Sequence, residues 1–124
     1  MSTTYDAVTT ALRVELKRAI RSRDAAAIAA LRSLLSTLDN AGAQPVASQS
    51  ASSTGSEHFA GALAGLGAAE VERRPLDAAE VAQLIDQEVA GRLEQAEHLE
   101  RAGRDRESAW ARYQAKLLSR FREL

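Results

Sequence analysis

The stretch from Asp77 to Ala102, DAAEVAQLIDQEVAGRLEQAEHLERA, constrains the fold of this 124-residue chain more than any other. It opens with the pattern of a capping box, in which Asp77 accepts a hydrogen bond from the backbone N–H of Glu80 and Glu80 reaches back to Asp77. The apolar residues that follow recur at the helical period; they are Val81, Leu84, Ile85, Val89, Leu93, Ala96 and Leu99. We therefore predict one long amphipathic helix here.

Two charged residues of this helix, Glu88 and Arg92, project into the apolar stripe, because successive residues turn by about 100°. A Glu four residues before an Arg is the favourable order for a helical ion pair. We predict such a pair on the core-facing side, with Arg32 or Asn40 of an earlier helix as a candidate member of its network. The structural interpretation is a pair that fixes helix register, and the functional alternative is a polar cluster that contacts a partner or ligand.

Two helices are predicted before this stretch. The first runs from Thr4 to about Ser22, capped by Ser2 or Thr3, with Tyr5, Val8, Leu12, Leu16 and Ile20 at helical spacing. The second starts after Asp24 and runs to about Asp39, where Asn40 and Gly42 supply the stop. Because the turn between them is short, they must form an antiparallel hairpin.

A fourth helix is predicted from a cap at Asp105 to about Arg122, after a break at Gly103. The expected fold is therefore all-α: a small bundle of four helices arranged as two antiparallel hairpins. We expect one domain, 1–124, in which residues 41–57 are a Ser/Ala-rich flexible loop and residues 58–76 a docked irregular segment.

The aromatic residues gather in the last helix, where Trp110, Tyr113, Leu117 and Phe121 share one face. Aromatic residues at helical spacing usually belong to a core, so we predict Trp110 and Tyr113 as core anchors. The alternative is a platform on which bases stack, and it requires both rings to face solvent.

Charge offers one candidate binding surface, although the formal net charge is only −1 and gives no overall attraction to nucleic acid. Arg13, Lys17 and Arg21 lie four residues apart on the first helix, with Arg18 beside them. A solvated helix face explains this pattern, and a short basic strip for phosphates is the functional alternative.

No pattern in the sequence indicates catalysis, a metal or a cofactor. The absence of cysteine excludes disulfides, zinc–thiolate sites and a thiol nucleophile, and His58 and His98 have no second ligand at metal spacing. The N-terminus does not have the order of a signal peptide, and no apolar run approaches the length of a membrane span. We expect a cytoplasmic protein with no membrane contact and no catalytic residues of its own.

Three stretches together resemble one known family, the YqeY-like or GatB/YqeY-domain proteins. They are LRSLLSTLDNA (Leu31 to Ala41), GLGAAEVERRPL (Gly65 to Leu76) and LDAAEVAQLIDQEVAGR (Leu76 to Arg92), the last followed by Ala102-Gly103-Arg104. The residues that match the family pattern are Arg32, Asn40, Glu88, Arg92 and Gly103.

This resemblance implies an all-α N-terminal domain of a small-bundle type, in a short form that stops at Leu124 without the C-terminal domain of longer members. The family is related to the tail region of the GatB subunit of the tRNA-dependent amidotransferase, which helps to hold tRNA. Its members are often labelled with carbon–nitrogen ligase activity that uses glutamine as amido-N-donor. The partners that the resemblance implies are tRNA or amidotransferase subunits.

The leading functional prediction is a non-catalytic binding or adaptor domain, with Arg13, Lys17, Arg18 and Arg21 facing phosphates. The second is a protein-interaction or homo-oligomerisation module without a nucleic-acid role, using apolar surface such as Leu118 or the segment from Phe59 to Leu66. The third is an enzyme that acts through Glu88 and Arg92.

Overall fold

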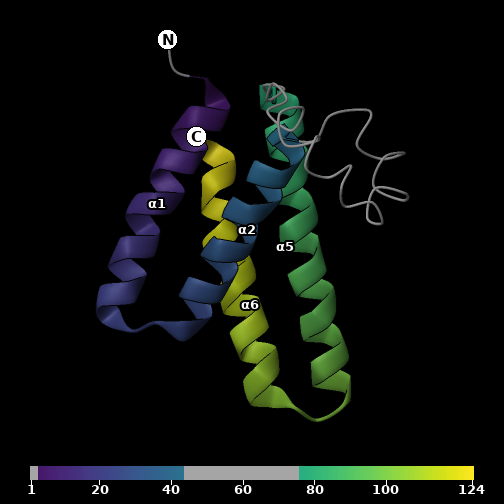
Figure 1. Cartoon of the computed structure of the whole chain (residues 1–124). Helices are drawn as coiled ribbons and strands as arrows, with labels where there is room; N and C mark the ends of the chain where they lie inside the picture. The colour runs from purple at the N-terminus through teal and green to yellow at the C-terminus, as the bar shows by residue number, and fades with distance from the viewer. Residues whose placement is uncertain (1–2, 44–75) are drawn as a thin grey trace, which may run out of the picture. The chain divides into compact units, whose positions relative to one another are not determined.

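The computed structural model describes residues 3–43 and 76–124, and these residues form four α-helices and one short 3₁₀ helix without any strand (Figure 1). The elements are α1 (Thr4–Ser22), α2 (Ala25–Ala43), α5 (Ala78–Arg101), α6 (Asp105–Ser119) and the 3₁₀ helix η1 (Arg120–Glu123). The predicted all-α class is confirmed.

The chain divides into two units, one of Met1–Leu38 with Leu76–Leu124 and the other of Asp39–Pro75. The first unit holds α1, most of α2, α5, α6 and η1, and we call it the helical body. The predicted loop 41–57 and docked segment 58–76 lie outside the described residues, except that residues 41–43 are helical and Leu76 is buried.

Capping boxes begin two of the helices. At α1 the Thr3 hydroxyl accepts from the Asp6 N–H at 3.1 Å, and the Asp6 carboxylate accepts from the Thr3 N–H at 3.2 Å. At α5 the Asp77 carboxylate accepts from the Glu80 N–H at 2.8 Å, and the Glu80 carboxylate accepts from the Asp77 N–H at 3.0 Å. These bonds satisfy backbone donors that the first helical turn leaves free, so both predicted helix starts are confirmed.

Two tight turns fold the helical body into antiparallel hairpins, α1 with α2 and α5 with α6 (Figure 1). In the first turn Arg23 takes the left-handed conformation (φ 58°), and the Asp24 carboxylate caps α2 by accepting from the Ala27 N–H at 3.0 Å. In the second turn Gly103 has a φ of 78°, a conformation that costs other residues more than glycine. The predicted hairpins follow from these local signals.

Two predicted helix boundaries need correction. α2 does not stop at Asn40 and Gly42 but continues to Ala43, because one glycine costs a helix only about 1 kcal/mol and its alanine neighbours favour the helix. Asp105 is the first residue of α6 and not its cap; Arg104 occupies the cap position, and its side chain pairs with Glu107 at 2.5 Å.

The core of the helical body is aliphatic. Its largest fully buried side chains come from all four helices: Val8, Leu12, Leu31, Leu34, Leu38, Val81, Ile85 and Leu118. Two members of the predicted apolar stripes lie outside this core, since Ile20 is 46% and Leu93 41% exposed.

The predicted core position of Trp110 and Tyr113 is wrong, because the two side chains are 48% and 46% exposed. The buried face of α6 is rotated toward small residues, among them Ser108, Ala111 and Ala115. Such residues let the backbones of two helices approach closely, and the Ser108 hydroxyl donates to the carbonyl of Ala96 in α5 at 2.9 Å. The bulky rings of the next face are therefore left at the surface.

Candidate functional site

The four basic residues predicted as a phosphate-facing strip, Arg13, Lys17, Arg18 and Arg21, are all exposed on α1. Arg18 forms a weak pair with Glu15 at 3.3 Å, with 70% of the Arg18 side chain exposed. Within the described part of the chain the other three form no ion pair. We call these four residues the basic strip.

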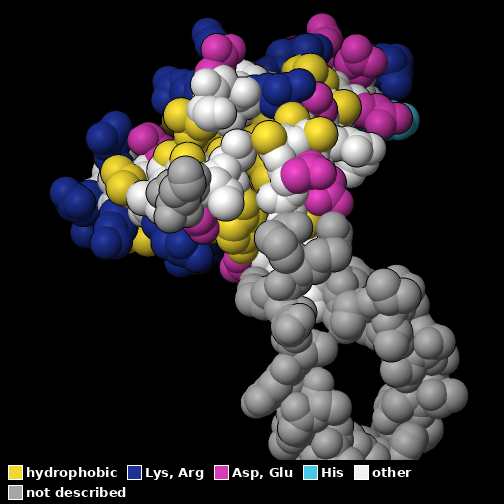
Figure 2. Space-filling view, turned by 90° about the horizontal axis from the view of Figure 1, so that it is seen from above, with side chains coloured by type: hydrophobic (Ala, Val, Ile, Leu, Met, Phe, Trp, Pro, Cys, Tyr) yellow, Lys and Arg dark blue, Asp and Glu magenta, His cyan; other side chains and the backbone are white. Residues whose placement is uncertain are grey.

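Charge is unevenly distributed over the helical body. α1 carries four cationic side chains and two carboxylates, whereas α5 carries two arginines and six carboxylates. Figure 2 shows the consequence: Lys and Arg side chains gather on the side where α1 lies in Figure 1, and acidic side chains are frequent on the opposite side. A net charge near zero therefore conceals one basic face.

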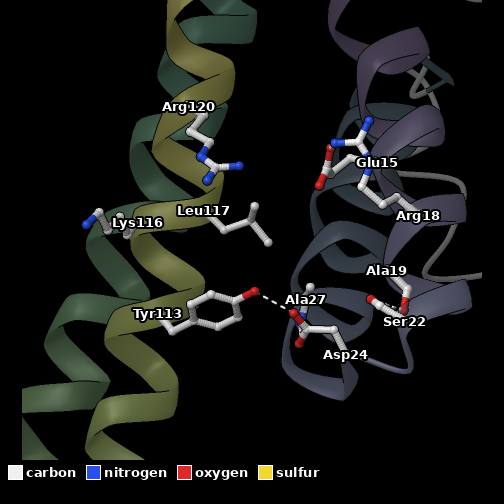
Figure 3. Close-up of a pocket in the computed structure, with 10 residues that line it drawn as sticks. All are labelled: Glu15, Arg18, Ala19, Ser22, Asp24, Ala27, Tyr113, Lys116, Leu117 and Arg120. Atoms are coloured by element: carbon white, nitrogen blue, oxygen red, sulfur yellow. Dashed lines mark hydrogen bonds and ion pairs between the residues drawn. The ribbon is translucent and has the colours of Figure 1, made fainter.

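A cavity of about 500 Å³ adjoins the basic strip, between the α1–α2 hairpin and α6 (Figure 3). Arg18 and Ser22 of α1 line one side, and Tyr113, Lys116 and Arg120 line the other. Its volume is in the range of small-molecule sites. In Figure 3 the guanidinium of Arg120 is directed toward the cavity, whereas the ammonium of Lys116, which also lines the cavity, points away from the α1–α2 hairpin.

Asp24 and Tyr113 join the two sides of this cavity. The Tyr113 hydroxyl donates to Asp24, whose other carboxylate oxygen caps α2. Because the hydrogen bond from Tyr113 stabilises the ionised carboxylate, it lowers the pKa of Asp24 below its usual range, and the N–H of Ala27 acts in the same direction. The same bond from Tyr113 to Asp24 raises the pKa of Tyr113, with burial adding to the effect. The contact therefore requires an ionised Asp24 and a protonated Tyr113.

The carboxylates at the cavity are already engaged, and two of its cations are not. Glu15 pairs with Arg18, and Asp24 is held by Tyr113 and a backbone N–H. Lys116 and Arg120 form no ion pair with any described residue. Sequence reasoning missed both, although they lie three and seven residues after Tyr113, on its side of the helix.

The predicted ion pair between Glu88 and Arg92 is present. The Arg92 guanidinium donates to Glu88 at 2.9 Å, and the two side chains are only 17–18% exposed. Two hydroxyls of α2 complete the arrangement, Ser33 donating to Glu88 at 3.1 Å and Thr37 at 2.9 Å. We call these four residues the polar cluster; it ties α5 to α2.

Of the two residues proposed to complete this cluster, Arg32 is exposed, and Ser33 beside it supplies a bond instead. Asn40, also exposed, belongs to the second unit of the chain. Both oxygens of Glu88 accept hydrogen bonds, and this satisfied geometry is what a structural role of the cluster requires. The geometry gives no support to an enzyme acting through Glu88 and Arg92.

Neither a metal site nor a membrane-spanning helix is present among the residues that the structure describes. In residues 3–43 and 76–124 no group of acidic, histidine or cysteine side chains could hold a metal ion, and His98 is exposed. None of the helices described is long and apolar enough to cross a membrane. Leu118, predicted as spare apolar surface, is fully buried, and His58 and residues 59–66 lie outside the described ranges.

Comparison with known proteins adds no family to these observations: no family model, no curated protein and no solved structure matches the chain.

Proposed function

We propose that this chain is a non-catalytic, YqeY-like binding domain that holds tRNA through the basic strip of α1. The observation that carries the proposal is the exposure of Arg13, Lys17 and Arg21 on one helix without any carboxylate partner among the described residues. Unpaired cations at a surface attract phosphates, and binding releases the counterions that surround the nucleic acid.

Two further features support this proposal. The cations continue beyond α1, since Arg18 adjoins the cavity that is also lined by Lys116 of α6 and by Arg120, the first residue of η1. Exposed aromatic rings lie in the same region: Tyr113 lines that cavity, and Trp110 lies one helical turn before it on α6. Proteins that bind single-stranded nucleic acid combine cationic side chains with exposed aromatic rings on which the bases stack.

The test is a titration of bulk tRNA by fluorescence anisotropy at low and near-physiological salt, with wild type and a Lys17→Gln/Arg21→Gln variant. We expect the variant to bind more weakly and the slope of log Kobs against log salt to become shallower by about 2, because two phosphate contacts are lost.

The matched control is Arg101→Gln/Arg106→Gln, which removes two exposed positive charges from α5 and α6. If both double variants weaken tRNA binding equally, the effect is one of net charge, and the assignment to the basic strip is wrong. If wild type shows no salt-dependent binding, the tRNA proposal itself is wrong.

A protein-interaction module remains the second candidate, and one observation favours it. Trp110 is 48% exposed, and it lines a hollow of about 310 Å³ with Leu99 and Ala111. Exposed aromatic side chains beside apolar hollows are typical anchors of protein interfaces. A molecular mass by light scattering that rises with concentration in wild type, and not in Trp110→Ala, would support this candidate.

A further inference from the structure

We propose that the cavity between the α1–α2 hairpin and α6 binds a nucleoside monophosphate, with its base on the ring of Tyr113 and its phosphate at Arg120 and Lys116. The inference rests on the proposed function for its choice of ligand and goes beyond it, because it assigns a separate site outside the basic strip. The ligand is either a free nucleotide or one unstacked nucleotide of an RNA strand.

The cations of the cavity favour one phosphate group. Arg120 and Lys116 have no carboxylate partner among the described residues, whereas Glu15 and Asp24 are both occupied by other groups. An arginine offers a planar fork of donors to phosphate oxygens. Lys116 supplies a point charge on a flexible four-carbon stem, which reaches the phosphate by rotating from the position drawn in Figure 3. Two free cations match the charge of a single phosphate monoester.

The aromatic ring favours a ligand larger than an inorganic ion. Tyr113 is held at its hydroxyl end by Asp24, and 46% of the residue remains exposed, so the ring is oriented while part of its surface is free to stack (Figure 3). Stacking of bases on tyrosine is a common mode of RNA recognition. A volume of about 500 Å³ also exceeds what one oxyanion needs.

The spacing along α6 and into η1, which continues it, brings these groups into one site. From Tyr113, Lys116 and Arg120 follow after three and seven residues, a rise of about 4.5 Å and about 10.5 Å along the helix. These intervals keep all three on one side of the helix. The base and phosphate sites are thus displaced along the helix axis, as the two ends of a nucleotide are displaced.

We test this by titrating the ¹⁵N-labelled full chain with AMP, with inorganic phosphate and with adenosine, following amide shifts by NMR. AMP is expected to shift signals around Tyr113 to Arg120 and around Ser22, and to bind at least ten-fold more tightly than phosphate or adenosine. Equal affinity for AMP and phosphate, or no saturable shift with AMP, overturns the proposal.

Variants assign the roles. Lys116→Gln/Arg120→Gln is expected to weaken AMP binding at least ten-fold, and Tyr113→Leu to reduce the preference for AMP over phosphate. The matched control Arg101→Gln/Arg106→Gln, at two exposed cations that do not line this cavity, leaves AMP affinity unchanged. An AMP affinity that survives Lys116→Gln/Arg120→Gln, in a variant whose circular dichroism matches wild type, overturns the site.

The tRNA titration separates the two sources of the ligand and the two proposals. Weaker tRNA binding by Lys116→Gln/Arg120→Gln than by the charge control Arg101→Gln/Arg106→Gln assigns the site to a nucleotide within RNA, and tRNA binding equal to that of the control assigns it to a free nucleotide. Salt-dependent tRNA binding without AMP binding overturns the cavity site alone. AMP binding without tRNA binding overturns the function proposed for the basic strip and leaves the cavity site in place.

Discussion

The polar cluster gives the sharpest test of how the helical body is held together. Removing the carboxylate by Glu88→Ala leaves Arg92, whose side chain is 18% exposed, without its partner, and leaves the hydroxyls of Ser33 and Thr37 without their acceptor. Breaking a fully buried pair costs about 3–5 kcal/mol. Since this pair is partly solvated, we expect a loss of about 3 kcal/mol in the free energy of unfolding.

Removing the arginine of the pair, instead of the carboxylate, is expected to lower the free energy of unfolding by less. In Arg92→Ala the carboxylate keeps both hydroxyl donors, so the loss is about 1–2 kcal/mol. Arg92→Met is expected to be milder still, because methionine restores apolar packing and removes the Nε of Arg92, which is buried without an acceptor among the described residues. The order of destabilisation is therefore Glu88→Ala, then Arg92→Ala, then Arg92→Met.

Urea and thermal unfolding followed by circular dichroism measure these losses. For a chain of this length about 1 kcal/mol corresponds to roughly 4 °C in Tm, so we expect decreases of about 12 °C for Glu88→Ala and about 6 °C for Arg92→Ala. Glu94→Ala, an exposed carboxylate of the same helix, is the control and should change stability by less than about 0.5 kcal/mol. A Glu88→Ala protein as stable as this control, or less affected than Arg92→Ala, refutes the reasoning.

Two further predictions concern Asp24 and the glycines. The hydrogen bond from Tyr113 lowers the pKa of Asp24, so the stability that the Asp24 carboxylate contributes is present above its unfolded pKa of about 3.9 and is lost as pH falls through the lower folded pKa. Urea titrations of Tyr113→Phe at pH 2 to 6 should show a smaller loss of stability on the acid side, and a pH profile equal to that of wild type would contradict this prediction. Gly103→Ala places a side chain at a residue with a φ of 78° and should lower the free energy of unfolding by about 1 kcal/mol. Gly91→Ala, within a helix and with open space around it, should raise the free energy of unfolding by about 0.5–1 kcal/mol. Equal changes in the Tm of the two variants would refute the conformational argument.

Local signals made most of this fold predictable from sequence. Asp24 and Asp77 cap their helices by accepting hydrogen bonds from backbone donors only three residues away, and Gly103 itself adopts the positive φ of its turn. Each of these features can therefore be predicted without the tertiary structure. The pair between Glu88 and Arg92 also lies within one helix. Its four-residue spacing was sufficient to predict the contact.

Features that depend on another helix were not predictable in this way. The exposure of Tyr113 follows from the rotation of α6 toward Ala111 and Ala115, and alanine gives a weaker periodic signal than an aromatic ring. Ser33 and Thr37 of α2 donate hydrogen bonds to Glu88 of α5 because of the way the two hairpins pack against each other. The spacing of residues within a single helix does not specify that packing. The cavity likewise combines residues from three α-helices, η1 and the turn at Asp24.

The uneven charge of the helical body has a consequence for how the molecule behaves in solution. Because α1 carries two more cations than carboxylates and α5 carries four more carboxylates than cations, the helical body has an electric dipole that a pI of about 6.1 does not reveal. Within about 8 Å of a polyanion at physiological salt, this dipole turns α1 toward the negative surface before contact. Fewer encounters are then in the wrong orientation, and the association rate rises. The same orientation would make an acidic protein co-purify with cellular RNA and adhere to phosphorylated resins at a pH where its net charge is negative.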